Sequence, residues 1–424
     1  MKCCAIVGIN WGDEGKGRMV DLLAENYDVV IRYQGGGNAG HTVVNRYGKY
    51  ALHLLPSGIF HPGTVNVLGN GVALDMENLW TEMENMRSGG VKITPDNLKI
   101  SDRASLLLPW HRDLDALEET RLGAKQYGST RQGIAPFYSD KYQKKTVLAG
   151  ELFYPEQLRE HLAELLEWKN LIIAGVYGAE PYSLERLTAW VTEYGERIRP
   201  FLCDAGAYLR SASAEGKNLL FEGQLGALRD LDYGIYPYTT SSNSIAAYAP
   251  IGSGLPTARL DEVIGVVKAY STCVGEGPFP CESFGEEASL LREAGGEYGA
   301  KTGRPRRVGP LDLVATRYGT EIQGANILAL TKLDVLSYMD KIPVCTQYEI
   351  SGTKTSAFPF PAVLSRAKPV LEMLDGWKCD ISSVRRWEDL PIQAKNYVQF
   401  MEERIGCPIR YISVGPQRDA VILK

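Results

Sequence analysis

The residues best suited to chemistry lie in a glycine-rich segment near the start of the chain. Residues 10–17 read Asn-Trp-Gly-Asp-Glu-Gly-Lys-Gly, after the apolar run 3–9 and before a helix-compatible stretch. A strand, a glycine loop and a helix N-terminus aim several backbone N–H groups at one point, which suits a phosphate. Lys16 adds a positive charge. Asp13 and Glu14 would repel an anion. An acid in a phosphate-binding loop therefore needs another function, either holding Mg²⁺ or taking a proton.

This segment is not a Walker A motif, because a glycine, Gly17, follows Lys16 where that motif has serine or threonine. A tight turn between a strand and a helix would use the same glycines without binding anything. The loop alone therefore leaves open whether it holds a phosphate.

A second glycine-rich segment narrows the choice. Residues 34–42 read Gln-Gly-Gly-Gly-Asn-Ala-Gly-His-Thr, after the strand-like residues 28–33. The three consecutive glycines allow the backbone to approach a ligand closely, and Asn38, His41 and Thr42 can read or protonate it. In a parallel α/β sheet the two loops would lie side by side at the carboxyl ends of their strands. The pair therefore predicts one site for a phosphate-bearing ligand.

With these two segments the chain resembles the adenylosuccinate synthetase family, in a Gram-positive or clostridial-like form. Further motifs continue the likeness: LHLLPSGI at 52–59, GNGVAL at 69–74, YPYTTSSN at 236–243, VKAYSTCVGEGPFP at 267–280, EYGAKTGRPRR at 297–307, TKLDV at 331–335 and ISVGP at 412–416. The resemblance covers essentially the whole chain. It implies GTP-dependent ligation of IMP and L-aspartate to adenylosuccinate, with GDP and phosphate released through a 6-phosphoryl-IMP intermediate, in the committed step of AMP synthesis.

The resemblance also implies a role for each matching residue. Asp13 and His41 are the expected catalytic residues: Asp13 takes the N1 proton of IMP, and His41 donates to the charge developing between the 6-oxygen and the γ-phosphoryl. Mg²⁺ is expected at Asp13 and the backbone of Gly40. The expected GTP-binding residues are Gly12, Asp13, Glu14, Gly15, Lys16, Gly17, Gly40, Thr42, Arg306, Lys332, Asp334, Ser413, Gly415 and Pro416. The expected IMP-binding residues are Asp13, Lys16, Asn38, His41, Thr130, Lys144, Leu225, Thr240 and Arg304, and those for aspartate are Thr302, Arg304 and Arg306.

The chemistry of two downstream segments agrees with these roles. Asp334 follows the strand-like residues 327–330. A carboxylate there can accept from N1–H and N2–H₂ of guanine, donors that adenine lacks, and Lys332 can lie along the purine face. The arginines of 302–307 offer forked donors that match the two carboxylates of aspartate. Taken alone, the first segment could be a solvated strand end and the second a solvated charged face.

The chain departs from the commonest form of the family in four places. Residues 128–136 read GSTRQGIAP instead of a pattern nearer GTTGRGIGP, and Lys301 takes a usual threonine position. FEGQLG replaces FEGAQG, so Leu225 aligns with the glutamine that reads IMP. Lys144 stands where an arginine usually reaches across a homodimer to the partner's IMP phosphate. We therefore expect a homodimer in which Lys144 acts in trans.

Composition sets broad limits on the class of protein. The 424 residues are 44% hydrophobic and 23% charged, an ordinary globular mixture. A net charge of −5 argues against a broad nucleic-acid surface. No apolar run reaches the ~18 residues of a membrane span, and the start of the chain leaves no room for a signal peptide. Eight scattered cysteines without a Cys-x-x-Cys pair are expected to be reduced core thiols, so we expect a cytoplasmic enzyme.

Alternating periodicities predict an α/β fold: an open, mainly parallel central sheet with helices on both faces and smaller accessory segments. Because chemistry-bearing motifs run from residue 10 to residue 416, we expect residues 1–424 to form a single catalytic domain. Expected helices are 76–86, 112–121, 156–167, 184–209, 311–322, 361–374 and 392–405. Expected strands are 3–9, 28–33, 66–69, 218–222, 262–270, 327–330, 343–350 and 409–413.

Two other functions stay open at this stage. The changes at Leu225 and at Arg131 and Gln132 are compatible with a paralogue that ligates aspartate to another 6-oxopurine nucleotide, such as GMP or dGMP. A GTP-binding protein without ligase activity is the second alternative. It should lack an acid and a histidine poised for proton transfer, whereas this chain has Asp13 and His41.

Overall fold

A ten-stranded sheet forms the centre of the molecule. The computed structural model describes residues 1–45, 47–299, 303 and 305–424. Along the sheet the order is β20-β19-β15-β11-β1-β10-β2-β5-β7-β9, and only β20 runs antiparallel to its neighbour. These strands are β1 Cys3–Gly8, β2 Val29–Arg32, β5 Val65–Leu68, β7 Leu98–Ser101, β9 Leu202–Cys203, β10 Leu219–Gly226, β11 Glu262–Lys268, β15 Ile327–Thr331, β19 Ile409–Ser413 and β20 Val421–Leu423.

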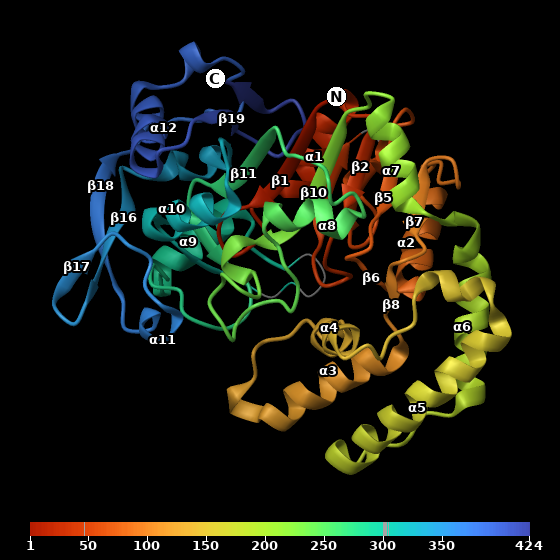
Figure 1. The fold of residues 1–424 in the computed structure, drawn as a ribbon. Helices are drawn as coiled ribbons and strands as arrows, with labels where there is room; N and C mark the ends of the chain where they lie inside the picture. Colours follow the sequence, from red (N-terminus) through yellow and green to blue (C-terminus); the bar gives the residue numbers. More distant parts are fainter. Residues whose placement is uncertain (46, 300–302, 304) are drawn as a thin grey trace.

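Helices cover both faces of this sheet, and β1 shows why. Its side chains alternate: Cys3, Ala5 and Val7 pack in a cluster with residues of α7, whereas Cys4 and Ile6 pack in a cluster with residues of α1. A strand buried on both faces needs an apolar residue at every position, which is what the apolar start of the chain supplies. The expected α/β class, with a mainly parallel sheet between helices, is confirmed (Figure 1).

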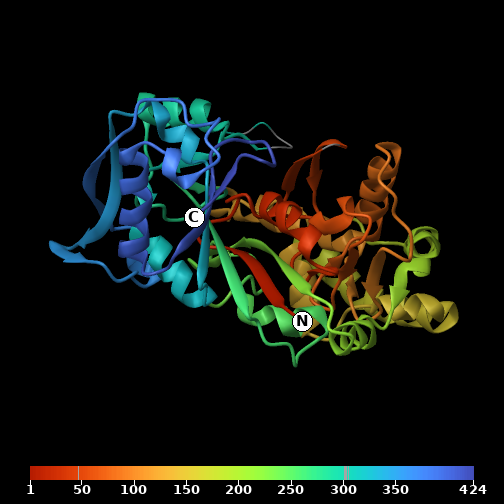
Figure 2. The same cartoon turned by 90° about the horizontal axis from the view of Figure 1, so that it is seen from above.

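The helices fall into groups that Figures 1 and 2 separate clearly. One group, α2 to α6, lies on the side of β7 and β9 and extends below the sheet in Figure 1, and α9 to α12 lie on the side of β15 and β19. The helices are α1 Lys16–Leu23, α2 Met76–Ser88, α3 Pro109–Leu122, α4 Ile134–Tyr142, α5 Pro155–Tyr177, α6 Leu184–Ile198, α7 Ala205–Ala214, α8 Ala249–Ser253, α9 Gly285–Gly295, α10 Leu313–Gln323, α11 Pro361–Leu364 and α12 Ile392–Ile405.

Smaller sheets surround the central one. The largest consists of β14, β16, β17 and β18, and it lies at the outer edge of the α9–α12 group in Figure 1. The hairpin of β3 and β4 follows the second glycine segment. The bounds are β3 His41–Asn45, β4 Gly48–Leu52, β6 Ala73–Leu74, β8 Ser105–Leu106, β12 Ser271–Cys273, β13 Arg307–Gly309, β14 Leu311–Asp312, β16 Lys341–Ile350, β17 Thr353–Thr355 and β18 Lys368–Asp375.

The single helix expected over 184–209 is wrong. The chain instead forms α6, a short 3-10 turn, β9 and then α7. Pro200 lacks the N–H that a continuing helix needs, so α6 ends just before it. Asp204 then starts α7 as its N-cap, accepting from the backbone N–H of Ala207 at 2.8 Å. The short strand between them pairs with β7 and extends the sheet.

The helix expected over 361–374 is also wrong. Only α11 is helical there, and β18 pairs antiparallel with β16. Pro369 cannot sit in a helix interior without losing a hydrogen bond, and the following residues alternate between half-buried and exposed, which is a strand period. In the described part of the chain, no helix has both the length and the apolar character needed to cross a membrane.

Candidate functional site

The glycine loops and the downstream motifs meet where the parallel strands of the central sheet reach their carboxyl ends. Parallel strands end at a common edge, and the first loop leaves the carboxyl end of β1, the second the carboxyl end of β2. β10 lies between these two strands and ends at Gly226 at the same edge. On the other side of β1, the ends of β15 and β19 carry the 331–335 and 412–416 motifs. The topology thus gathers five strand ends into one candidate site.

Glu14 turns inward and holds the first loop together. Its carboxylate accepts from the backbone N–H groups of Asn10 (3.1 Å) and Gly12 (2.8 Å) and pairs with Lys16 Nζ at 2.7 Å. Both side chains of this ion pair are buried. A Cβ at Gly8 would lie 2.5 Å from the Glu14 carboxylate, so glycine is required below the loop. Glu14 therefore fixes the loop and the position of the Lys16 ammonium.

Asp13 points the other way, toward the open side of the loop. Its backbone is left-handed, with φ of 58°, and it lies between Gly12 and Gly15, whose φ values are 103° and 102°. Its side chain is 31% exposed and forms an ion pair with Arg306, with 2.9 Å between Oδ2 and Nη2. Glu14 and Asp13 thus have opposite surroundings, and only Asp13 presents a carboxylate to a ligand.

His41 lies beside this loop and is held by a buried carboxylate. Its Nδ1 is 2.5 Å from Oε1 of Glu222, which is fully buried in β10. Glu222 also accepts from the backbone N–H and the hydroxyl of Ser57, at 2.8 and 2.7 Å. A Cβ at Gly17 would come within 2.5 Å of the His41 side chain, so the first turn of α1 packs directly on it. Within the described residues, the buried His41 Nε2 has no hydrogen-bond partner.

The protonation of this pair follows from burial and charge. Burial tends to raise the pKa of Glu222, but the hydrogen bond from His41 and the Arg32 guanidinium outweigh it, so the pKa is lowered. Burial lowers the pKa of His41 despite the opposing carboxylate. Glu222 is therefore ionised and His41 neutral, with Nδ1–H donated to Glu222, a tautomer assigned from the hydrogen-bond network. The arrangement can accept a proton at Nε2 when negative charge develops nearby.

The residues that replace the usual FEGAQG motif lie at the end of β10. Leu225 has φ of 59°, is half-buried, and its Cα lies 3.6 Å from where a Cβ on Gly12 would stand. Gln224 points toward the second glycine loop instead: its Nε2 donates to the carbonyl of Gly36 in that loop (3.0 Å) and to the carbonyl of His53, just after β4 (3.3 Å). Its Oε1 is buried without a partner among the described residues. The backbone of Leu225 therefore packs against the Asp13 loop.

The second glycine loop contacts the segment around Thr240. Asn38 folds back on its own loop and accepts from the backbone N–H of Gly36 at 3.2 Å. The Thr240 hydroxyl is 3.4 Å from that of Ser242, which donates to Gln34 Oε1 at 2.9 Å. The expected IMP-binding residues Asn38 and Thr240 thus belong to one connected group.

The motif expected to read guanine lies at the ends of β15 and β19. Lys332 has φ of 60° and donates from Nζ to Glu297 Oε1 at 2.9 Å. Burial raises the pKa of the half-buried Asp334, and the charges of Lys332 and Arg18 oppose this rise. The guanidinium of Arg18 also donates to the hydroxyl of Ser413. The loop that continues through Gly415 and Pro416 lies next to the Asp334 element, because β15 and β19 are paired.

Two expected IMP contacts lie in exposed positions. Thr130 belongs to a loop tied to α3 by Asp115, which accepts from the Ser129 hydroxyl (2.6 Å) and the backbone N–H of Gly133 (2.9 Å). Lys144 follows α4, is exposed and has φ of 61°. Lys144 therefore presents its ammonium group to the surface just beyond the end of α4.

Gly40 and Thr42 flank His41 at the start of the β3–β4 hairpin, and both are exposed. A carboxylate oxygen of Asp13 and the carbonyl oxygen of Gly40 are hard donors of the kind Mg²⁺ prefers. The donor chemistry of these residues therefore fits the expected ion. Thr302 and Arg304, expected at aspartate, lie outside the described residues, as does Lys301.

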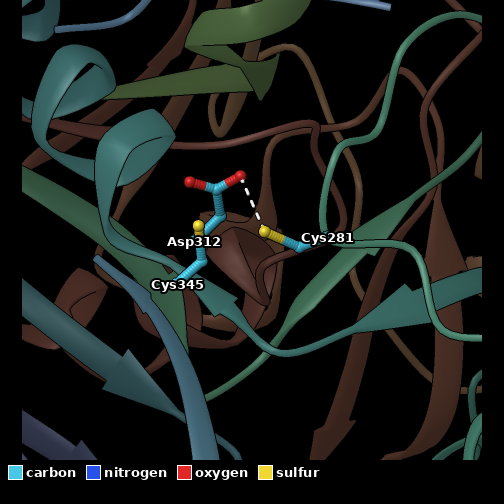
Figure 3. Close-up of side chains that lie close together, drawn as sticks. All are labelled: Cys281, Asp312 and Cys345. Carbon is cyan, nitrogen blue, oxygen red and sulfur yellow. Dashed lines mark hydrogen bonds between the residues drawn. The ribbon is translucent and has the colours of Figure 1, made fainter. Parts of the chain in front are cut away.

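A separate group of metal-ligating side chains lies below α10 (Figure 3). Ligand atoms of Cys281, Asp312 and Cys345 lie within 4.8 Å of one another. Asp312 is the N-cap of α10, accepting from the backbone N–H of Ala315 at 3.0 Å. Its other oxygen accepts from the Tyr348 hydroxyl (2.5 Å) and the Cys281 thiol (3.1 Å). Because thiols are soft ligands and the carboxylate already has protein donors, this group anchors α10 and does not suit Mg²⁺.

Sequence reasoning did not single out two buried acids of the site, Glu222 and Glu297. Each stood inside a quoted motif, and an acid within an apolar strand, as in Leu219-Leu220-Phe221-Glu222, is the one signal that could have identified the first. Their partners, such as His41 and Lys332, are far away in the sequence, so one sequence alone cannot pair them.

Comparison with known proteins places this site in a family. The profile of the adenylosuccinate synthetase family matches residues 5–422. An adenylosuccinate synthetase of Caldanaerobacter subterraneus subsp. tengcongensis is 46% identical over the whole chain and 99% of its own length. The adenylosuccinate synthetase 1 of Methanosarcina acetivorans is 42% identical over the full length of both chains.

Two solved structures extend the comparison. The fully ligated adenylosuccinate synthetase of Plasmodium falciparum superposes with a TM-score of 0.93, at 36% identity and 99% coverage of both chains. The succinoaminodeoxyadenylate synthetase of cyanophage S-2L, bound to dGMP and dATP, has a TM-score of 0.64 at 20% identity, covering all of this chain and 95% of the phage chain. The second likeness concerns the fold alone.

Proposed function

Because the chain belongs to the adenylosuccinate synthetase family, we propose that it ligates IMP and L-aspartate to adenylosuccinate at the expense of GTP, releasing GDP and phosphate. The observation that supports this proposal is that two chemically different groups, the Asp13 carboxylate and the His41 imidazole, lie beside the first glycine loop. Asp13 offers an accessible carboxylate, and His41 offers a buried Nε2 backed by the Glu222 carboxylate. A nucleotide-binding protein that only hydrolyses GTP needs no such acid and histidine at the γ-phosphoryl.

The first step must make a poor leaving group into a good one. The 6-oxo group of hypoxanthine becomes nucleophilic when N1 loses its proton, and Asp13 is the carboxylate available to take it. The 6-oxygen then attacks the γ-phosphorus, the bond to the β-bridging oxygen breaks, and GDP leaves. In the second step the aspartate amine attacks C6 and the oxygen departs on phosphate. One GTP is therefore consumed for each C–N bond formed.

His41 is suited to the charge that builds during phosphoryl transfer. Once Nε2 has taken up a proton from solvent, it donates a hydrogen bond to the oxygen between C6 and phosphorus, while Nδ1–H stays bonded to Glu222. An imidazolium formed beside a fixed carboxylate is stabilised in a site from which water is excluded. Asp13 and the Gly40 carbonyl would hold Mg²⁺, which when bound would neutralise further phosphoryl charge. Lys16, fixed by Glu14, adds a third positive group.

The remaining residues bind the three substrates. Asp334 accepts from N1–H and N2–H₂ of guanine, and Lys332 lies along its face. Arg306 binds a carboxylate of aspartate once it leaves Asp13, and the family likeness adds Thr302 and Arg304. For IMP the likeness gives Asn38, Thr130, Leu225, Thr240 and Arg304, with Lys144 reaching from the partner of a homodimer. We propose that the whole chain acts as one catalytic domain in the cytoplasm.

A paralogue acting on GMP or dGMP is the second candidate, and the position of Leu225 favours it. The backbone of Leu225 lies beside Gly12, at a position where the family has a base-reading glutamine. The side chain of a leucine cannot form a hydrogen bond with a purine. Turnover of IMP against GMP and dGMP at equal concentration separates the two. A preference for IMP of at least about tenfold supports the first proposal, and a preference for either guanine nucleotide overturns it.

The proposal is tested by measuring phosphate release from GTP with IMP and aspartate each omitted in turn. We expect release only when all three substrates are present, in a one-to-one ratio with adenylosuccinate. Release that is unaffected by IMP and aspartate would identify a GTP hydrolase and contradict the proposal.

A further inference from the structure

A single buried glutamate gathers four donors between the expected GTP and aspartate sites. Glu297 has no solvent exposure. Its Oε1 accepts from Lys268 Nζ and Lys332 Nζ, both at 2.9 Å, and from the Tyr270 hydroxyl at 2.5 Å. Its Oε2 accepts from Arg306 Nη1 at 2.7 Å. Three cations therefore share one carboxylate in the interior.

The charges of this cluster depend on one another. Burial opposes ionisation of Glu297, but the cations of Lys268, Lys332 and Arg306 outweigh it and hold its pKa far below the usual range. Burial lowers the pKa of Lys268 to about 8, with Glu297 opposing that shift. Removing the negative charge would leave two lysines and an arginine facing each other in a buried space, which is costly.

The main chain also ties Glu297 to Arg306. The backbone N–H of Arg306 donates to the Glu297 carbonyl at 2.9 Å, and Tyr298 pairs with Pro305 in an isolated bridge. Glu297 and Arg306 therefore close the base of the segment between them, which carries the residues expected to bind aspartate. The Arg306 guanidinium reaches Asp13 with its other nitrogen, at 2.9 Å.

The two carboxylate oxygens of Glu297 thus serve two different ends of the site. Oε1 holds Lys332, which directly precedes Leu333 and Asp334 of the guanine-reading element. Oε2 holds Arg306, which bridges to the catalytic carboxylate of Asp13. A shift of either cation must move or unbalance the carboxylate that holds the other.

We propose that Glu297 is a positioning residue that couples the guanine end of the site to the aspartate end, so that GTP bound through Lys332 favours the Arg306 orientation that binds aspartate. This inference rests on the proposed function. The coupling is reciprocal, as any linkage between two binding sites must be. It acts without direct contact between Glu297 and either substrate.

The coupling is measured as the KM for aspartate at a GTP concentration well below its KM, divided by the KM for aspartate at saturating GTP. We expect a ratio of about 5 or more for the wild-type protein, falling below about 2 in Glu297→Gln. Tyr270→Phe is the matched control: it removes one hydrogen bond to the same oxygen, keeps every charge, and should keep the wild-type ratio. Thermal unfolding of each variant reports loss of fold separately.

Glu297→Asp keeps the proposal testable if the amide variant does not fold. Its charge still neutralises the cluster, but the side chain is one methylene shorter and cannot reach Lys332 and Arg306 together, so the ratio should fall at least by half. A wild-type ratio near 1, or an unchanged ratio in either folded Glu297 variant, would overturn the coupling. Turnover by the wild-type protein that does not require IMP and aspartate would instead overturn the proposed function.

Discussion

The role of Glu222 can be tested by removing its charge while keeping its shape. Glu222→Gln leaves a side chain that still fits between His41 and Ser57. The Ser57 backbone N–H needs an acceptor, so the amide oxygen takes that side and its N–H₂ group faces His41 Nδ1. His41 then stays neutral, with Nδ1 accepting and Nε2–H available as an uncharged donor.

The expected loss follows from the charge that is missing. The charge of an imidazolium and that of a carboxylate are each spread over several atoms, so we take their centres as about 4 Å apart. At that separation they attract by about 4 kcal/mol at an effective dielectric constant of about 20. At about 1.4 kcal/mol per tenfold, this sets an upper limit of about 10³ on the loss in kcat. Since a neutral Nε2–H still donates, with about half the strength of a charged donor, we expect a loss near 10², with the KM for IMP changed by less than about threefold.

The assay is steady-state adenylosuccinate formation at saturating GTP, IMP and aspartate. Ser57→Ala is the control, because it removes one hydrogen bond to Glu222 and leaves the charge; its kcat should stay within about threefold of the wild-type value. The double variant Glu222→Gln/His41→Asn should be no slower than His41→Asn alone, because Glu222 acts through His41. A folded Glu222→Gln protein with near-normal kcat, or a full additional loss on the His41→Asn background, would refute this reasoning.

Four further predictions concern the other ends of the site. Asp13→Asn should lower kcat by about 10²–10⁴ through loss of the general base; near-normal turnover in this variant would remove Asp13 from that role. Asp334→Asn should raise the KM for GTP and narrow the preference for GTP over ITP, which lacks the N2 amino group; an unchanged ratio of the two kcat/KM values would place the guanine pocket elsewhere. Arg306→Leu should raise the KM for aspartate at least about tenfold, since a charged hydrogen-bonded pair is lost; an unchanged KM would remove Arg306 from the aspartate site. Mixing Asp13→Asn with Lys144→Leu subunits should restore part of the activity, because heterodimers contain one site with neither lesion if Lys144 acts in trans; no recovery, with heterodimers present, would refute the shared site.

The sequence predicts the elements that position the site better than those around it. The strand expected over 409–413 is reproduced as β19, and the one over 327–330 differs from β15 by one residue. β15 is buried at every position, so its apolar run is nearly unbroken, whereas β19 keeps buried apolar residues at Ile409 and Ile412 around the exposed Arg410. The helices expected over 184–209 and 361–374 failed where a proline and a change of period sit inside a helix-like composition. Local propensity there is overridden by pairing with a distant strand.

In the candidate site, too, some features could be predicted from the sequence and others could not. Asp13 and His41 stood out by residue type within the glycine-rich segments, Asp334 was identified through the family resemblance, and the structure brings their elements to the carboxyl ends of neighbouring strands. The opposite orientations of Asp13 and Glu14 could not be read from the sequence, because they depend on a left-handed residue and a buried ion pair. The role of Glu297 depends on four donors from three separate segments, which only the folded chain assembles.

In the proposed reaction, the 6-oxygen of IMP leaves as part of the released phosphate. It is tested most directly with IMP labelled with ¹⁸O at position 6, in a reaction with GTP, aspartate and the wild-type protein. We expect one ¹⁸O atom in each phosphate formed, because the C6–O bond breaks after the oxygen has been phosphorylated. Unlabelled phosphate formed together with adenylosuccinate would contradict it, since the oxygen would then have left without ever binding phosphorus.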